Sequence, residues 1–184
     1  MRFFMEDADL FATHMRRALL ADFPKDADHA LRDRAIIISS SYRKAVHLAQ
    51  LDRQRLGEKL ICIFLTKMSI AASPLLEGPY VSACASCFER KFFAHLSSLE
   101  DHLWTQDSAA LSGKFYTSFL PSHLTMFSAI LRRAVTDEGA SRKNSLLYHF
   151  FDGSVQRLAF SPLHRCACRP PSACATTQDF SQFV

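Results

Sequence analysis

Runs of hydrophobic residues and amphipathic stretches alternate along the chain, and their order predicts an α/β fold. Two continuous apolar runs, at 34–40 and 59–66, are typical of strands that are buried on both faces of a parallel sheet. The stretch between them has the spacing of an amphipathic helix, which Ser40 or Ser41 can cap. A strand, a helix and a second strand in this order predict a right-handed crossover unit.

The flanking segments predict the rest of the architecture. Further elements are expected as helices over 7–21, 88–104 and 121–139 and as a third strand over 68–76. Asp152-Gly153 stands between two apolar segments, 146–151 and 155–160, and its turn chemistry predicts a β-hairpin. The predicted fold is therefore a small, mainly parallel sheet with flanking helices, a helical crossover and a C-terminal hairpin.

Composition narrows the class of protein. With 184 residues and 48% hydrophobic content, the chain suits one domain with a real core. Its apolar runs are shorter than the roughly 18 residues that span a membrane, and its acidic beginning does not resemble a secretory signal. We therefore expect a cytoplasmic protein without membrane contact. The net charge of +4 is modest and the basic residues are scattered, so we expect no nucleic-acid partner.

The cysteines carry the clearest chemical signal. Cys84 and Cys87 form a CxxC pair, and a second group, Cys166, Cys168 and Cys174, follows about 80 residues later. Paired cysteines in a reducing compartment favour metal binding, and four thiolates complete the tetrahedral shell of zinc. We predict a structural zinc site formed by Cys84, Cys87, Cys166 and Cys168, with Cys174 as the alternative ligand. Such a site would pin the hairpin to the CxxC segment.

Other uses of the cysteines stay open. The six cysteines could form three disulfides in a secreted protein, or Cys84 and Cys87 could form a redox pair. The redox interpretation is less favoured because a redox CxxC opens a helix, whereas this pair follows the Gly78-Pro79 turn. His164 is an alternative zinc ligand, although the ordinary interpretation of this residue is an exposed loop histidine. Cys62, in the middle of an apolar run, is interpreted as a core residue. None of the eight histidines stands in a local motif that predicts cysteine catalysis.

The order of these motifs resembles a known family. The successive segments AIIISSS, YRKAVHLAQLDRQRLGE, KLICIFLTK, SIAASPLLEGPY and CASCFERK resemble the second half of the adenylating domain of the ThiF/MoeB (ubiquitin-activating-enzyme-like) superfamily. The segment YHFFDGSVQRLAFSPLHRCAC resembles the family's closing hairpin with its second cysteine pair. The closest variants are the McbB-like and cyclodehydratase partner proteins that work with YcaO proteins on thiazole- and oxazole-containing peptides.

This resemblance implies a function and a domain division. It implies a non-catalytic scaffold or adaptor in a bacterial antibiotic-type pathway that installs azolines in a ribosomally made peptide. The implied partners are a YcaO-type cyclodehydratase, a flavin dehydrogenase and the precursor peptide, in an oligomeric complex. The expected divisions are an N-terminal helical segment, 1–33, a truncated ThiF-like domain, 34–174, and a loose tail, 175–184.

The chain departs from the family in three respects that keep other functions open. Its five glycines form no GxGxxG or phosphate-binding loop, and its second cysteine pair is CxC rather than CxxC. In addition, no residue matches the family's substrate-activating arginine or nucleotide-binding aspartate. One alternative is a subunit of an adenylating or sulfur-transfer enzyme whose nucleotide-binding half lies on another chain. The other is a zinc-ribbon module for protein interaction.

Overall fold

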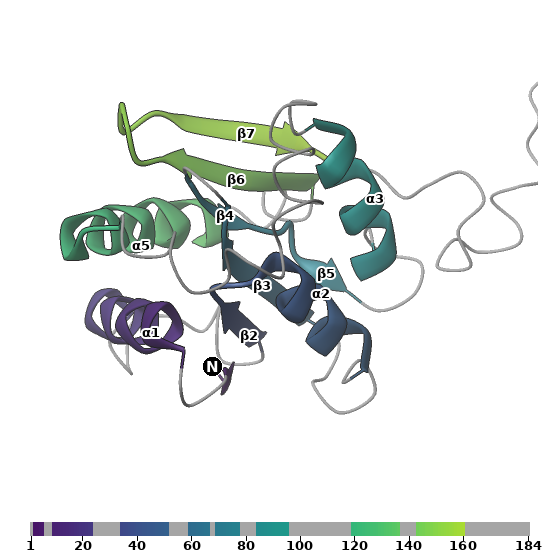
Figure 1. Cartoon of the computed structure of the whole chain (residues 1–184), viewed down its shortest axis with the longest axis horizontal. Coiled ribbons are helices and arrows are strands. Elements are labelled where there is room, and N and C mark those ends of the chain that lie inside the picture. The colour runs from purple at the N-terminus through teal and green to yellow at the C-terminus, as the bar shows by residue number, and fades with distance from the viewer. Residues whose placement is uncertain are drawn as a thin grey trace, which may run out of the picture.

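The computed structural model describes residues 2–5, 9–23, 34–51, 59–66, 69–77, 84–95, 119–136 and 143–160. The elements are β1 (Arg2–Phe4), α1 (Leu10–Asp22), β2 (Arg34–Ser39), α2 (Tyr42–Leu51), β3 (Lys59–Leu65), β4 (Ser69–Ala72), β5 (Leu76–Glu77), α3 (Ala85–His95), α5 (Pro121–Thr136), β6 (Asn144–His149) and β7 (Val155–Ala159). Figure 1 shows a sheet between two pairs of helices. The described residues include no helix that is long and apolar enough to cross a membrane.

The sheet is mixed. Six of its seven described strands follow the order β1-β2-β3-β4-β6-β7, and the seventh, β5, pairs with β3 beside this path. β1, β2 and β3 are parallel, as the sequence predicts for the crossover unit, whereas all other pairs are antiparallel. The connection from β3 to β4 is too short for a parallel crossover, which needs a dozen or more residues. The backbone therefore reverses there, and Thr66 N–H donates to the carbonyl of Ser69 (2.8 Å).

The β2–α2–β3 unit follows the hydrophobic pattern closely. All residues of β2 are buried, as are all but the first of β3. Ser41 caps α2, because its carbonyl accepts from Ala45 N–H at 3.0 Å and its hydroxyl accepts from Lys44 N–H at 3.5 Å. The predicted continuation of this helix beyond Leu51 lies outside the described residues.

The predicted third strand is divided in the structure. β4 pairs with one end of β3, and β5 pairs with the other end around Leu60. Ser73, Pro74 and Leu75 separate the two strands. Ser73 bonds Cys62 twice, since its N–H donates to the Cys62 carbonyl (2.8 Å) and its hydroxyl accepts from Cys62 N–H (2.9 Å). Pro74 has no N–H to donate to the ladder, which explains the break.

The N-terminal segment contributes more than the predicted helix. β1 pairs in parallel with β2, so the sheet begins one strand earlier than the sequence indicated. Arg16 of α1 stacks over the Phe3 ring at 5.7 Å. Asp9 caps α1 by accepting Ala12 N–H (3.0 Å) and also accepts Ser40 N–H (2.6 Å) at the end of β2. This one carboxylate therefore ties the start of α1 to the carboxyl end of the sheet strand.

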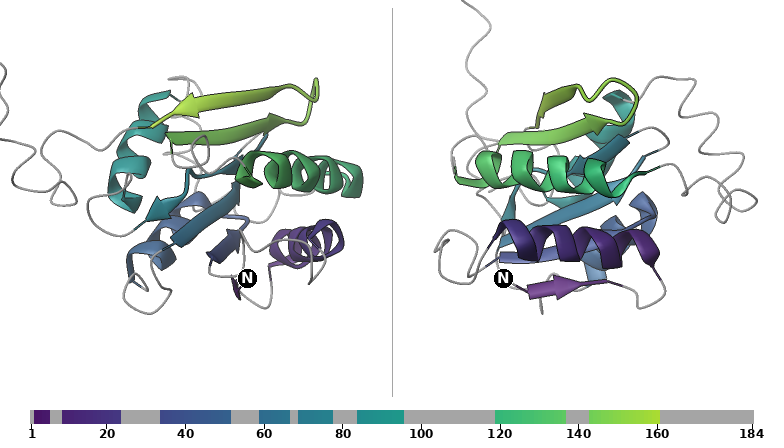
Figure 2. Two further views of the ribbon diagram at one scale, coloured as in Figure 1. Left: turned by 180° about the vertical axis from the view of Figure 1, so that it is seen from behind. Right: turned by 90° about the vertical axis from the view of Figure 1, so that its left-hand side faces the viewer.

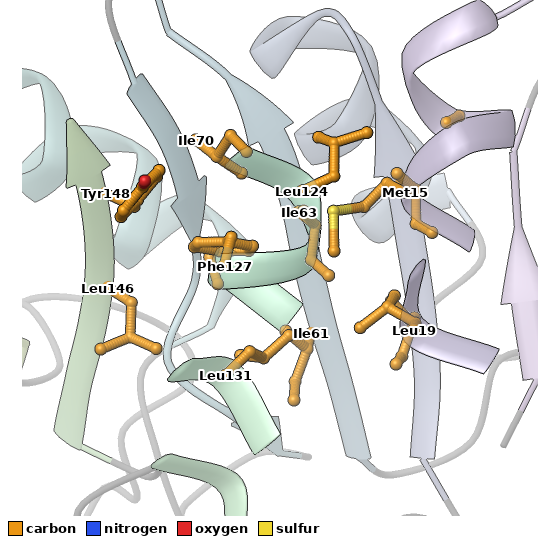
Figure 3. Close-up of a cluster of buried hydrophobic side chains, with 14 of the residues drawn as sticks. Met15, Leu19, Ile61, Ile63, Ile70, Leu124, Phe127, Leu131, Leu146 and Tyr148 are labelled. Carbon is orange, nitrogen blue, oxygen red and sulfur yellow. The ribbon is translucent and has the colours of Figure 1, made fainter. Parts of the chain in front are cut away.

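Two hydrophobic clusters fill the space on either side of the sheet. α1 and α5 lie side by side on one face and α2 and α3 cover the other (Figure 2). Alternation along β3 divides its side chains, so that Ile61 and Ile63 join the α1/α5 cluster while Cys62 and Phe64 join the α2/α3 cluster. Figure 3 shows the first cluster, in which Phe127 of α5 lies among the strand residues.

β6 and β7 form an antiparallel pair at the far edge of the sheet. The turn between them contains Asp152, whose carboxylate accepts Ser154 N–H (2.9 Å), and Gly153, whose φ of 68° is a left-handed conformation that glycine adopts without strain. Hydrogen bonding to Ser154 lowers the pKa of the Asp152 carboxyl. The hairpin tip is exposed, and Phe151 shows 90% of its surface to solvent.

Candidate metal centre

The CxxC pair lies at the start of α3. Cys84 directly precedes the helix, and its carbonyl accepts Phe88 N–H at 2.9 Å. Its sulfur accepts Cys87 N–H at 3.4 Å, in the place where a capping side chain normally binds. The three-residue spacing places both cysteines on the same side of the first turn.

This arrangement corrects one argument from the sequence. The redox interpretation was less favoured because the pair was expected to follow a turn, yet the CxxC does open a helix. Burial now provides the better argument against redox chemistry. Cys84 is 8% exposed and Cys87 is fully buried, whereas reactive cysteines are partly accessible.

An aromatic cluster holds α3 against the sheet. Phe92, one turn after Phe88, lies 5.3 Å from Phe64 of β3 and 5.8 Å from Tyr42 of α2, measured between ring centroids. Tyr42 and Phe64 are themselves 5.0 Å apart. All four rings are buried, so they fix the position of the helix that begins with the cysteine pair.

The end of the hairpin joins the same cluster. Phe160 directly follows β7 and is 5% exposed. Its ring centroid lies 5.1 Å from that of Phe88, the residue after Cys87. Phe160 N–H also donates to the carbonyl of Lys143 (2.6 Å), which extends the pairing of β6 with β7 by one position. The last described residue of the chain is therefore packed beside the first turn of α3.

The structure describes two of the predicted zinc ligands. Cys166, Cys168 and Cys174 lie outside the described residues, as do His164 and the predicted tail 175–184. Within the described part of the chain, no three His, Cys, Asp or Glu side chains are grouped so that they could hold a metal. Cys84 and Cys87 fit half of a tetrathiolate zinc site, since both are thiol donors that share one buried helix turn. The four-ligand set stays a prediction.

Cys62 lies apart from this pair and is a core residue, as the sequence indicated. It is fully buried in the α2/α3 cluster, and its thiol lies 3.9 Å from the carbonyl oxygen of Ala45. Burial raises the pKa of the Cys62 thiol to about 12. A thiol held in its neutral form is a poor metal ligand and a poor nucleophile.

Comparisons with solved structures identify the type of fold. The structure of the heterocyclase TruD aligns with 86% of this chain with a TM-score of 0.56 and 13% identity. A heterocyclase in complex with substrate and cofactor aligns with 91% of it with a TM-score of 0.59 and 8% identity. The E. coli microcin synthetase McbBCD complex aligns with 73% of it with a TM-score of 0.53 and 10% identity. The chain has a heterocyclase-like fold.

The heterocyclase-like fold is only part of those larger proteins. This chain spans about a quarter of each heterocyclase, 25% and 24%, and 52% of the McbBCD component. No protein-family model and no curated protein matches the sequence. At identities of 8–13% the likeness concerns the arrangement of the chain, and it assigns no residue a role.

One contact that positions the candidate centre was not predicted from the sequence, namely the packing of Phe160 on Phe88. The sequence does contain a partial signal for this contact, because Phe88 directly follows Cys87 and Phe160 precedes Cys166 by six residues. The sequence does not indicate which of the sixteen phenylalanines pack against each other.

Proposed function

We propose that this chain is a non-catalytic scaffold subunit of a complex that installs azoline rings in a ribosomally made peptide. The observation that carries the proposal is the heterocyclase-like fold. Two heterocyclases align with most of this chain, and the microcin synthetase complex contains a similar fold. In this proposal the ATP-dependent ring formation belongs to a YcaO-type cyclodehydratase. The chain positions that enzyme, with a flavin dehydrogenase and the precursor peptide as the other partners.

The proposal includes a structural zinc ion bound by Cys84, Cys87 and two cysteines of the C-terminal group. Cys166 follows Phe160 by six residues. A chain of that length reaches up to about 20 Å, and Phe160 already packs beside the first turn of α3. The reach is therefore sufficient for Cys166 and Cys168, and also for Cys174 if the proline pair between them folds back.

This ion would act on the fold rather than on a substrate. Four thiolates leave no open position for water or substrate on zinc. Binding instead closes the long loop between the CxxC and the second cysteine group, and metal-binding free energy offsets the entropy of that closure. The zinc would thus keep the hairpin and α3 in the relative position that the aromatic cluster shows.

A scaffold role also agrees with the sequence, because its five glycines form no phosphate-binding motif. The competing candidate is a subunit that adenylates a substrate with help from another chain. The two candidates differ in a measurable activity, namely exchange of pyrophosphate into ATP.

The test is reconstitution with a YcaO-type protein and a precursor peptide encoded beside this chain. We expect the chain to co-purify with the YcaO-type protein and to raise the yield of peptide that has lost one water per ring, measured by mass spectrometry. The chain alone should give no ATP–pyrophosphate exchange. Exchange by the chain alone would establish the competing enzyme. Failure both to retain the YcaO-type protein and to affect ring formation would leave only an interaction module.

A further inference from the structure

The edge of the sheet at β7 is open to solvent. Among the described strands β7 pairs with β6 alone and ends the sheet order. Every residue of β7 except Leu158 is exposed. Edge strands are normally protected by proline, a bulge, lysine or a covering segment, and β7 contains no proline. Its position on the outside of the hairpin is visible in Figure 1.

The pairing register defines which backbone groups this edge presents. Phe160 N–H donates to Lys143, and His149 N–H donates to Ser154, so the pairs 143/160 and 149/154 are hydrogen-bonded. Hydrogen-bonded pairs alternate along an antiparallel ladder, which assigns 145/158 and 147/156 to the same class. The remaining β7 residues, Val155, Arg157 and Ala159, direct their N–H and C=O groups away from β6. Three successive outward positions are sufficient to bind an extended backbone.

The side chains at these positions favour an acidic occupant. Arg157 pairs with Leu146, so it lies on the α5 face of the sheet, and it lines a cavity with Leu131 and Val135 of α5. α5 carries two exposed arginines and no acidic residue. In the described hairpin, 143–160, the only acidic residue is Asp152 at the tip. Within the described residues of α5 and the hairpin, Arg157 is therefore an exposed cation at the centre of a strand edge, and the one carboxylate lies at the hairpin tip.

A second copy of this chain is a poorer occupant than an acidic strand. A symmetric antiparallel pairing of two β7 edges centred on the middle of the strand would place Arg157 opposite Arg157 of the partner. Like charges directly opposite each other in a sheet are destabilising. The backbone groups require an extended segment, and the charge requires that its central residue be acidic.

We propose that the free edge of β7 binds an extended acidic segment of a partner protein as an additional strand. Backbone hydrogen bonds to Val155, Arg157 and Ala159 provide the affinity, and an acidic side chain beside Arg157 sets the register. This is recognition by strand addition, in which main-chain bonds bind and alternate side chains select. The inference rests on the register and charge of β7 and does not depend on the proposed function.

The probe is a blocked, fluorescein-labelled peptide, Thr-Thr-Val-Glu-Val-Thr-Thr, titrated with the whole chain and followed by fluorescence anisotropy. Its glutamate faces Arg157, and its valines lie on the opposite face, beside Gln156 and Leu158. Two control peptides separate the contributions: one has lysine in place of glutamate, and the other is N-methylated at alternate residues along the bonding edge. We expect the glutamate peptide to bind best and both controls to bind at least about fivefold more weakly.

Variants of the chain provide the matching half of the test. Arg157→Glu should reverse the preference so that the lysine peptide binds better, whereas Arg17→Glu, the same change on exposed α1, should leave the preference unaltered. Ala159→Pro removes an outward N–H without removing a β6–β7 bond, so it should abolish binding in a folded protein. If that variant does not fold, the N-methylated peptide tests the same bonds from the other side.

Two results would overturn the proposal. One is equal binding of the glutamate, lysine and N-methylated peptides, including the case in which none binds. The other is a dimer in sedimentation velocity that Ala159→Pro dissociates, because the edge would then be occupied by a second copy.

Discussion

The ring of Phe160 lies 5.1 Å from that of Phe88, and this contact joins the end of the hairpin to the helix that begins with the CxxC pair. The two residues are far apart in sequence. Phe88 directly follows Cys87, and Phe160 precedes Cys166 by six residues. Phe88 is fully buried and Phe160 is 5% exposed. The relative position of α3 and β7 is therefore defined by packing, and zinc would act on an arrangement that the aromatic cluster already favours.

Replacing Phe160 with alanine should destabilise the protein. Removing a buried phenylalanine costs about 3–5 kcal/mol, through lost burial and an unfilled cavity, and we expect the lower end because Phe160 keeps 5% of its surface exposed. The free energy of unfolding is measured by urea titration at neutral pH. Phe151→Ala, at a side chain that is 90% exposed, is the matched control and should change it by less than about 0.5 kcal/mol. Equal effects of the two substitutions would contradict the packing role.

The proposed zinc site predicts that substitution of its cysteines removes the metal and that substitution of Cys62 does not. The purified chain should contain about one zinc ion, since four thiolates bind one tetrahedral ion. Cys84→Ser and Cys87→Ser should each lose it, whereas Cys62→Ala should retain it because Cys62 is a separate core residue. Metal content by mass spectrometry and thiol titration check this. Cys168→Ser and Cys174→Ser identify the fourth ligand, and we expect only the first to lose zinc. A folded, metal-free protein with accessible thiols would refute the site.

Patterns that depend on local residues could be predicted from the sequence. The continuous apolar runs of β2 and β3 are buried on both faces, and Pro121 is the first residue of α5, as its preference for the first turn predicts. Asp152 and Gly153 lie between the two strands that the sequence placed on either side of them. In these segments the signal is local: a continuous apolar run, a proline at the first helical position or a pair of turn residues.

Features that depend on distant partners could not be predicted in this way. β1 has only three residues, and it is a strand because Phe3 and Phe4 pair with Ile36 and Ile37 of β2. The third strand is divided at Pro74, and the two bonds that join Ser73 to Cys62 just before this break depend on a partner that the hydrophobic pattern does not encode. For the candidate site, the spacing of Cys84 and Cys87 predicted a pair of metal ligands. Their place at the start of α3 could not be predicted, because no capping signal precedes Ala85.

Asp9 should stabilise the folded protein although it lies near the start of the chain. Its two carboxylate oxygens accept Ala12 N–H within α1 and Ser40 N–H after β2. Asp9→Ala removes a helix cap and leaves a partly buried donor unsatisfied, with an expected loss of about 2 kcal/mol. Asp9→Asn keeps one acceptor oxygen and should lose about half as much. Urea titrations of the two variants check this order, and a larger loss for asparagine than for alanine would contradict it.

The thiol of Cys62 makes stability decrease in alkaline solution. Burial raises its pKa in the folded state to about 12, above the ordinary value of 9.0 that applies to the unfolded chain. As the pH rises above 9.0, the unfolded chain releases this proton while the folded chain keeps it, so base favours unfolding. The stabilisation is complete below the unfolded pKa and is lost as the pH approaches the folded pKa.

Cys62→Ala isolates this effect from the other groups that titrate in base. We expect the wild-type free energy of unfolding to fall more steeply than that of Cys62→Ala once the pH exceeds 9.0, although the variant is less stable at neutral pH because it loses a buried sulfur. Native wild-type protein at pH 9 should also leave Cys62 unmodified by iodoacetamide, which reacts with thiolates. Parallel pH profiles for the two proteins, or rapid alkylation of Cys62 in the native state, would mean that this thiol ionises as an exposed one does.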